Sequence, residues 1–220
     1  MSLTLYAPLG NPRAAKIEIV AEHLKVDLQF NRIDYRQIKN KEYLSKHPLG
    51  KVPLLDTPEG PIYESNAILR YLARKQNALY GSNSFEIAQV DQWLDFHNNE
   101  IDPLTFTLMA MIAGWQPANK DLYAEAKKGL KEAVKVLEGS LKGKKFLVGD
   151  SVTIADITIA SVLSIPFRLL FDEKVRHGIP SVTEWYKNVC AIPAFQSVLG
   201  KTWLCEKEYE VHFHEEAKPV

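Results

Sequence analysis

The stretch KVPLLDTPEGPIYES, residues 51–65, carries the pattern that decides the fold. Its apolar segments 52–56 and 61–63 flank the turn-forming residues TPEG, which is the pattern of a β-hairpin. Because a proline cannot donate a backbone hydrogen bond inside a sheet, Pro53 marks the start of the first strand. The second strand runs directly into a helical segment at Ser65, so the stretch predicts a β-β-α unit.

A β-α-β unit precedes this hairpin. Residues 3–6 have the pattern of a short strand, and residues 26–33 alternate in polarity as a half-buried strand does. Between them a helix begins at Pro12, because proline suits the first helical turn, where its missing N–H would be unpaired anyway. An irregular helical connection then leads to the hairpin. These elements predict a mixed four-stranded sheet covered by helices, ending near residue 78.

A second domain with only helical periodicity follows a short segment of turn-forming residues. We expect an α/β domain over 1–78, a linker over 79–84, an all-α domain over 85–209 and a polar tail over 210–220, whose last six residues have the composition of a linker. The helices expected in the second domain cover 87–111, 122–141, 154–170, 182–189 and 195–199. Thr153 and Asp156 have the spacing of a capping box at the start of the third of these helices.

The composition excludes several classes of function. The chain has 27 Lys and Arg against 27 Asp and Glu, so it lacks the basic excess with which proteins grip nucleic acids. No apolar run reaches the ~18 residues of a membrane-spanning helix, and the N-terminus has no signal-peptide pattern. Cys190 and Cys205 stand apart, and His212 and His214 have no further ligand beside them. We therefore expect a cytoplasmic protein with reduced thiols and no metal site.

The hairpin stretch also contains candidate binding residues. A cis peptide bond before Pro53 would turn the backbone of Val52 toward an extended ligand, although the trans form is far more common for such a bond. Ser65 suits the N-cap of the following helix, whose free N–H groups would hold a carboxylate. Glu64 would then take an ammonium group of the same molecule. Each residue also has a purely structural explanation, because Ser65 caps its helix in either case and exposed acids are common.

The combination of these elements resembles the cytosolic glutathione transferases, which join a thioredoxin-like domain to an all-α domain. The resemblance covers nearly the whole chain and is carried by LY at 5–6, HPLGKVP at 47–53 and YESNAILRYL at 63–72. It implies that the protein binds glutathione and needs no other cofactor.

The same resemblance assigns roles to individual residues. The cysteinyl part of glutathione would pair with the backbone of Val52 before Pro53, and the γ-glutamyl end would lie at Glu64 and Ser65. The glycyl carboxylate would be held by Lys51, with His47 as a weaker candidate.

Conjugation chemistry requires a group that stabilises the glutathione thiolate, because a free thiol is mostly protonated at pH 7. The resemblance indicates a tyrosine at the end of the first strand, which is Tyr6, or a serine at the start of the first helix. That serine is missing here, and only the amide of Asn11 and nearby backbone N–H groups could replace it. We rank Tyr6 first and Asn11 second, while a core aromatic is an equally good reading of Tyr6.

A narrower resemblance is to the gamma subunits of translation elongation factor 1. It is carried by residues 11–16, 64–68 and 152–158, and above all by PAFQSVLG at 193–200 with LCEK at 204–207. It implies a domain that docks the beta subunit of the elongation complex.

The alternative is a stand-alone glutathione transferase that acts on small electrophiles. Phe106, Met109 and Trp115 would then line the electrophile pocket, although core packing explains these apolar residues equally well. Either reading implies a homodimer with contacts near residues 62–71, and neither involves nucleic acid or membrane.

Overall fold

The four strands form one mixed sheet in the order β2-β1-β3-β4 in the computed structural model of the chain, which describes residues 3–211 and 213. The strands are β1 (Leu3–Ala7), β2 (Leu28–Arg32), β3 (Leu54–Thr57) and β4 (Gly60–Tyr63). β1 pairs parallel to β2 and antiparallel to β3, and β3 and β4 form the predicted hairpin. The predicted linker composition at 215–220 and the predicted absence of metal at His212 and His214 fall on residues outside those described.

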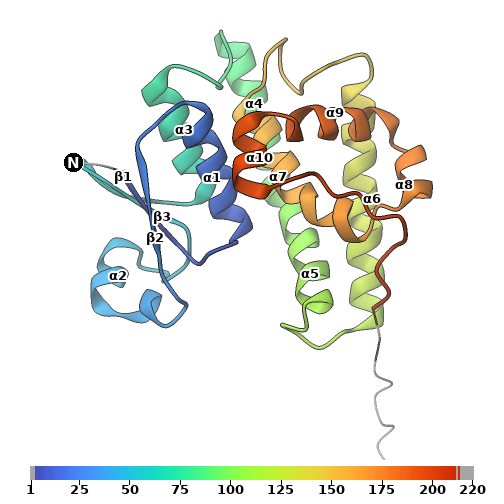
Figure 1. Cartoon of the computed structure of the whole chain (residues 1–220), viewed down its shortest axis with the longest axis horizontal. Coiled ribbons are helices and arrows are strands. Elements are labelled where there is room, and N and C mark those ends of the chain that lie inside the picture. The colour runs from blue at the N-terminus through green and yellow to red at the C-terminus, as the bar shows by residue number, and fades with distance from the viewer. Residues whose placement is uncertain (1–2, 212, 214–220) are drawn as a thin grey trace, which may run out of the picture.

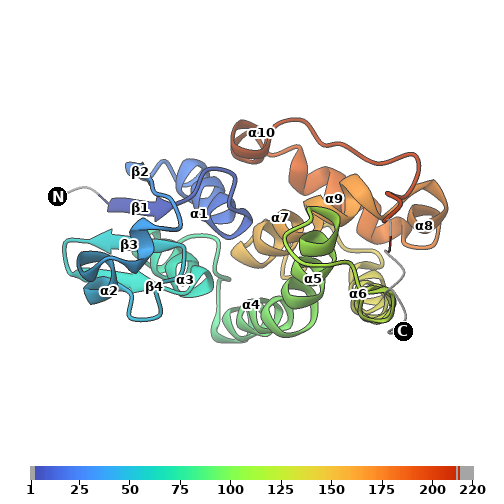
Figure 2. The same cartoon turned by 90° about the horizontal axis from the view of Figure 1, so that it is seen from below.

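Helices cover both faces of the sheet (Figures 1 and 2). The long helices α1 (Pro12–His23) and α3 (Ser65–Gln76) belong to the same core as the buried Leu5 of β1. The short helix α2 (Lys41–Lys46) and the 3-10 turn η1 (Gln37–Lys39) form the irregular connection, and their apolar residues pack with Tyr6. Successive side chains of a strand point to opposite faces, so Leu5 and Tyr6 belong to different layers.

The second domain is all-α, as predicted. Its helices are α4 (Ser84–Phe96), α5 (Asp102–Ile112), α6 (Lys120–Leu141), α7 (Ile154–Leu169), α8 (Glu173–His177), α9 (Pro180–Cys190) and α10 (Pro193–Leu199). The prediction of one continuous helix over 87–111 is wrong, because a π-helical turn, η2 (His97–Ile101), separates α4 from α5. Pro103 follows this turn, and a proline has no N–H for the regular helical ladder. The short helix α8 was not predicted.

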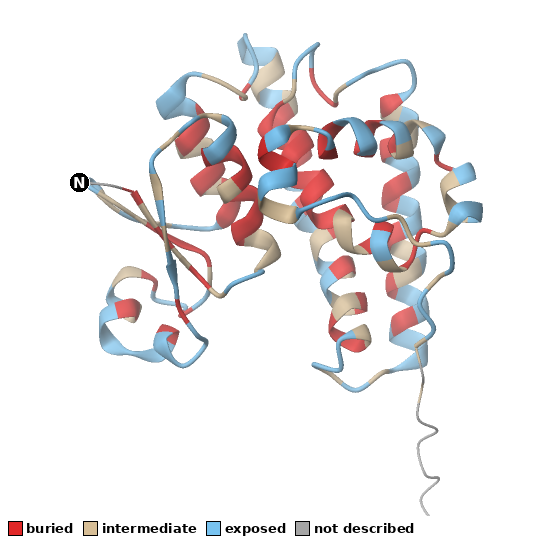
Figure 3. Ribbon diagram, viewed as in Figure 1, coloured by how far each residue is buried: buried red, intermediate tan, exposed pale blue. Residues whose placement is uncertain are grey.

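The two domains share one hydrophobic core (Figure 3). Helix α1 packs against α7 and α10 of the second domain, and the backbone N–H of Ile154 donates to the carbonyl of Leu79. Helix α7 is the most deeply buried helix of this core, and the predicted capping box of Thr153 and Asp156 is present at its start. The carboxylate of Asp156 also accepts hydrogen bonds from the Leu147 backbone and the Trp185 indole. This packing holds α5 opposite the loop that follows β1.

A cavity between the two domains

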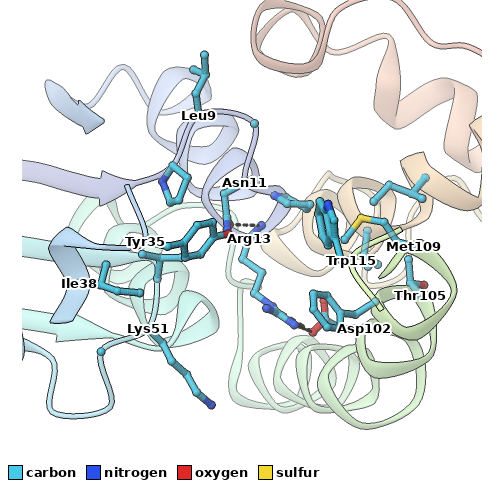
Figure 4. Close-up of a pocket in the computed structure, with 18 of the residues that line it drawn as sticks. Leu9, Asn11, Arg13, Tyr35, Ile38, Lys51, Asp102, Thr105, Met109 and Trp115 are labelled. Atoms are coloured by element: carbon cyan, nitrogen blue, oxygen red, sulfur yellow. Dashed lines mark hydrogen bonds and ion pairs between the residues drawn. The ribbon is translucent and has the colours of Figure 1, made fainter. Parts of the chain in front are cut away.

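A cavity of about 580 Å³ lies where the two domains meet, beyond the carboxyl end of β1 (Figure 4). On one side it is lined by the β1–α1 loop, by Lys39 and by the segment before β3. On the other side α5 contributes Phe106 and Met109, which Trp115 joins from the loop after that helix. These are the three residues predicted to line an electrophile pocket, and Phe106 and Trp115 are 44% and 66% exposed. Two lysines therefore line the cavity on the side of the α/β domain, beside Tyr35 and Ile38, and aromatic side chains line it on the side of the helical domain.

The β1–α1 loop places Asn11 in the cavity wall. Its side-chain Oδ1 accepts hydrogen bonds from the backbone N–H groups of Arg13 and Ala14, each at 3.0 Å, so Asn11 is the N-cap of α1. The structure shows no hydrogen bond from the Asn11 amide nitrogen within residues 3–211, and this nitrogen can only donate. Asn11 therefore combines a capping role with a free donor at the cavity.

The segment before β3 lines the cavity with Lys51 and Val52. The Val52–Pro53 peptide bond is cis, so the expectation from frequency alone, a trans bond, is wrong. The Tyr43 hydroxyl donates a hydrogen bond to the Lys51 carbonyl at 2.7 Å. Because Tyr43 belongs to the first turn of α2, this bond ties the segment to that helix. Pro53 itself is buried. In this segment the residues that can contact a ligand in the cavity are therefore Lys51 and Val52.

Glu64 and Ser65 lie beside this segment because of the hairpin register. Leu54 pairs with Tyr63, so the residues that follow Tyr63 lie next to those that precede Leu54. The prediction that Ser65 is the N-cap is wrong: Glu64 occupies that position without a side-chain capping bond, and Ser65 is the first helical residue. Glu64 has φ +67°, a sparsely populated conformation for a residue with a side chain. Since no side chain caps α3, its first N–H groups stay available to a carboxylate.

Buried polar contacts connect this helix start to the other elements of the site. Asn66 accepts a hydrogen bond from the Lys16 ammonium of α1 and donates one to the Leu94 carbonyl of α4. Burial lowers the pKa of Lys16 from 10.5 to about 7, partly offset by the attraction of Asp102. Asp102 also accepts from the Arg13 guanidinium at 2.6 Å, an ion pair that crosses the domain boundary (Figure 4).

Five predicted site residues are not among those that line the cavity: Tyr6, His47, Pro53, Glu64 and Ser65. Tyr6 is half-buried on the α2 side of the sheet, with the Lys46 ammonium 5.7 Å from its ring centre. His47 is 2% exposed and stacks on Tyr63 with ring centroids 4.4 Å apart. Burial lowers the pKa of His47, and its Nδ1 has no hydrogen-bond partner among the described residues. Of the predicted site residues, Asn11, Lys51 and Val52 line the cavity, whereas Glu64 and Ser65 lie beside it through the hairpin register, and Pro53, Tyr6 and His47 are not part of its lining.

Lys39 is one of several cavity residues that were not predicted from the sequence. It ends the 3-10 turn and lines the cavity with Lys51, so two lysines stand on the same side. Residues 37–46 have no clear periodicity, and nothing in the sequence distinguishes Lys39 from the neighbouring Lys41. Within the described residues no cluster of His, Cys, Asp or Glu could hold a metal ion, and no helix there could span a membrane.

Two family profiles match the chain, one for each domain. The glutathione S-transferase N-terminal domain matches residues 1–74, and the glutathione S-transferase C-terminal domain matches residues 96–193. The probable elongation factor 1-gamma 2 of Arabidopsis thaliana is 37% identical over 204 residues, covering 91% of this chain and 49% of that protein. The chain spans about half the length of the curated relatives it matches.

Solved structures show the same architecture. The GST-like domain of elongation factor 1-gamma from Saccharomyces cerevisiae superposes with a TM-score of 0.80 at 22% identity, covering 97% of this chain and 99% of that one. A glutathione S-transferase-I bound with the ligand lactoylglutathione gives a TM-score of 0.79 at 26% identity, over 90% and 98% of the two chains. With both of its domains matched in sequence and in fold, the chain belongs to the glutathione transferase family.

Proposed function

We propose that the chain is the glutathione-transferase-like domain of an elongation factor 1-gamma protein, which holds the beta subunit of elongation factor 1 during translation elongation in the cytoplasm. The main support for this proposal is that the sequence identity to elongation factor 1-gamma proteins extends through both domains. The segment LCEK at 204–207, on which the narrower resemblance rests, is part of the fold. The Cys205 backbone N–H donates to the Phe167 carbonyl at 3.0 Å, and the Arg176 guanidinium donates to the Cys205 carbonyl at 2.5 Å.

Co-purification tests this role. The tagged chain is mixed with the untagged N-terminal fragment of a beta subunit, and a family transferase that lacks the pattern at 193–207 serves as the control. We expect the fragment to elute with the chain in a fixed molar ratio and to be absent from the control. Elution of the fragment alone would contradict the scaffold role.

We further propose that the cavity binds glutathione. The hairpin register brings the Val52 backbone and the free start of α3 together, which suits a ligand with a peptide-like middle and a carboxylate at the γ-glutamyl end. Glu64 would take the ammonium group of that end. Lys51, joined by Lys39, would hold the glycyl carboxylate on the α/β-domain side of the cavity. This arrangement uses Lys39 in place of His47.

We expect the chain to bind glutathione but to catalyse its conjugation only slowly. A hydroxyl that donates a hydrogen bond to the sulfur lowers the pKa of a bound thiol. In this cavity the side-chain donor nearest the start of α1 is the amide of Asn11 and not a hydroxyl. An amide is a weaker hydrogen-bond donor than the hydroxyl of a tyrosine or a serine, and Tyr6 is not among the residues that line the cavity. We therefore expect retention on immobilised glutathione together with slow conjugation. Conjugation at the rate of a dedicated transferase, lost in Tyr6→Phe, would favour the stand-alone enzyme instead.

A homodimer is the expected assembly. The region around β4 and α3 presents Tyr63, which is 39% exposed, beside the half-buried Ile62 and Tyr71. Large apolar side chains that are left partly exposed are common at subunit contacts. Light scattering of the purified chain should give twice the chain mass, and Tyr63→Glu should shift the mass toward the monomer. A monomeric wild type would refute this assembly.

A further inference from the structure

Strand β2 forms one edge of the sheet, on the same side as α10 (Figure 2). The Ile33 N–H, directly after this strand, donates to the Ala7 carbonyl of β1 at 3.1 Å. Because backbone groups point alternately to the two sides of a strand, those of Leu28, Phe30 and Arg32 point away from β1. Within the described part of the chain, no other segment bonds to these groups. A free edge of this kind can accept a further strand.

A hollow of about 520 Å³ adjoins this edge on the face of the sheet that α1 covers. Phe30 pairs in register with the buried Leu5, so its side chain lies on the α1 face and lines the hollow. The other walls come from α1, from the turn that follows it and from Val198 of α10. A strand added to β2 would therefore point every second side chain into this hollow.

The hollow is separate from the cavity between the domains, because the two share no lining residue. Its position relative to α10 is fixed by the packing of that helix against α1. Val198 also lies within the segment 193–200, on which the narrower resemblance rests. The surface is thus formed by both domains and is independent of the proposed glutathione site.

The charge of the hollow is negative. Its lining includes the carboxylates of Glu18, Glu22 and Asp27 against one cation, Lys25. None of the three carboxylates forms an ion pair with another residue that the structure describes. Glu18 is half-buried, and burial raises the pKa of its carboxyl group, so a cation beside it would relieve an uncompensated charge.

Apolar side chains complete the lining. Four of them are half-buried and leave part of their surface open to a partner: Val26, Leu28, Phe30 and Val198. Together with the carboxylates they suit an occupant that carries both apolar and basic side chains.

We propose that the β2 edge and this hollow form a docking site for an extended segment of a partner protein that carries apolar and basic residues. The backbone of the segment would bond to the free groups of β2, and its basic side chains would reach the three carboxylates. A second copy of the chain suits the site less well, because a two-fold contact would bring two sets of the same carboxylates together. Docking at this edge requires neither bound glutathione nor the beta subunit of elongation factor 1.

A pair of fluorescein-labelled model peptides tests the chemistry of the site. The first has threonine at every second position, with valine and lysine by turns between the threonines. The second has glutamate in place of lysine. We expect the wild-type chain to bind the lysine peptide saturably in fluorescence anisotropy, and the glutamate peptide much more weakly. Absence of binding, or equal binding of the two peptides, would overturn the proposal.

Removal of the acidic lining should weaken the lysine peptide selectively. Glu18→Gln/Glu22→Gln/Asp27→Asn should bind it about three- to thirtyfold more weakly, the range expected from three partly exposed ion pairs. The charge reversal Glu18→Lys/Glu22→Lys should instead favour the glutamate peptide. Unchanged binding of the lysine peptide in the triple variant would overturn the proposal.

A matched control separates local from general charge effects. Asp121→Asn/Glu125→Gln/Glu132→Gln removes the same charge from the exposed side of α6, outside the hollow, and should bind the lysine peptide as the wild type does. Equal weakening by both triple variants would show that only the net charge of the chain matters, and the proposal would fail.

Backbone methylation tests whether the peptide binds as a strand. Methyl groups on the backbone nitrogens of every second peptide residue remove the donors on one side of the strand only. One of the two alternating sets should therefore abolish binding, whereas the other should be tolerated. Equal effects of the two sets would overturn strand addition.

Amide hydrogen exchange, followed by NMR, locates the bound peptide. The lysine peptide should slow exchange at Leu28, Phe30 and Arg32, whose N–H groups are free, and not at Gln29 or Asn31, which face β1. Protection confined to other parts of the chain would overturn the proposal. Protection of the three amides in the free chain, lost on dilution, would assign the edge to a second copy instead.

Discussion

The buried ammonium of Lys16 in α1 donates a hydrogen bond to the Oδ1 of Asn66 in α3, with 2.5 Å between the two atoms. The two residues are 1% and 3% exposed. Asn66 also donates to the Leu94 carbonyl at 3.0 Å, so one side chain connects α1, α3 and α4. Because Asn66 directly follows Ser65, this contact fixes the proposed glutathione site to the helical domain.

Replacing Lys16 should change how stability depends on pH. Burial lowers the pKa of Lys16 from 10.5 to about 7 in the folded chain. Between these values the unfolded chain binds more protons than the folded one, so the free energy of unfolding rises with pH, by at most about 1.4 kcal/mol per pH unit for one proton. Urea unfolding of Lys16→Met should lack this rise between pH 7 and pH 9. Parallel pH profiles for wild type and variant would contradict the buried titration.

Asp156 should be essential for the stability of the helical domain. Its carboxylate accepts hydrogen bonds from the backbone of Leu147 and Thr153 and from the indole of Trp185, each at 2.9 Å. Asp156→Ala leaves these buried donors without an acceptor, which should lower the free energy of unfolding by about 3–5 kcal/mol. Asp150→Ala, at an exposed neighbouring position, should cost less than about 0.5 kcal/mol. A similar cost for both variants in denaturant unfolding would show that the network matters little.

The Asn11 side chain should lower the pKa of the bound glutathione thiol, and the Tyr6 hydroxyl should have no effect on it. Asn11→Ala removes the N-cap of α1, at a cost of about 1 kcal/mol, and also removes the amide donor at the cavity. Asn83→Ala removes the matching N-cap of α4 and leaves the cavity intact. The pKa of bound glutathione, measured from thiolate absorbance, should rise in Asn11→Ala and stay unchanged in Asn83→Ala and Tyr6→Phe. A rise in Tyr6→Phe alone would restore Tyr6 as the thiolate partner.

The two lysines of the cavity should hold the glycyl carboxylate jointly. Lys39→Gln/Lys51→Gln should bind glutathione about three- to tenfold more weakly, since exposed ion pairs contribute little individually. Added salt should weaken the wild type more than this variant, because salt screens the same attraction. Lys41→Gln/Lys144→Gln removes as much charge from positions outside the cavity lining and serves as the control. Equal weakening by both double variants would indicate a general charge effect.

Local patterns predicted much of the fold. The hairpin, the first helix and the start of α7 follow from turn residues, from Pro12 and from the Thr153–Asp156 spacing, each of which acts within a few residues. The π-helical turn at His97 could not be predicted, because apolar residues continue at helical spacing on both sides of it. Only the folded structure shows that the helix is interrupted between α4 and α5.

The site was predictable to the extent that it depends on adjacent residues. Val52 and Glu64 come together through the register of one hairpin, which the sequence defines. Lys39 reaches the cavity through an irregular segment without periodicity, so only the folded chain identifies it. Strand alternation places Tyr6 on the face opposite Leu5, but which face looks toward the cavity depends on how the second domain docks.

Calorimetric titration of the wild-type chain with glutathione tests whether the cavity between the domains is a glutathione site. We expect saturable binding of one molecule per chain, with a Kd that increases in Lys39→Gln/Lys51→Gln and is unaffected by Lys41→Gln/Lys144→Gln. The absence of binding heat, together with an unchanged melting temperature at millimolar glutathione, would contradict it.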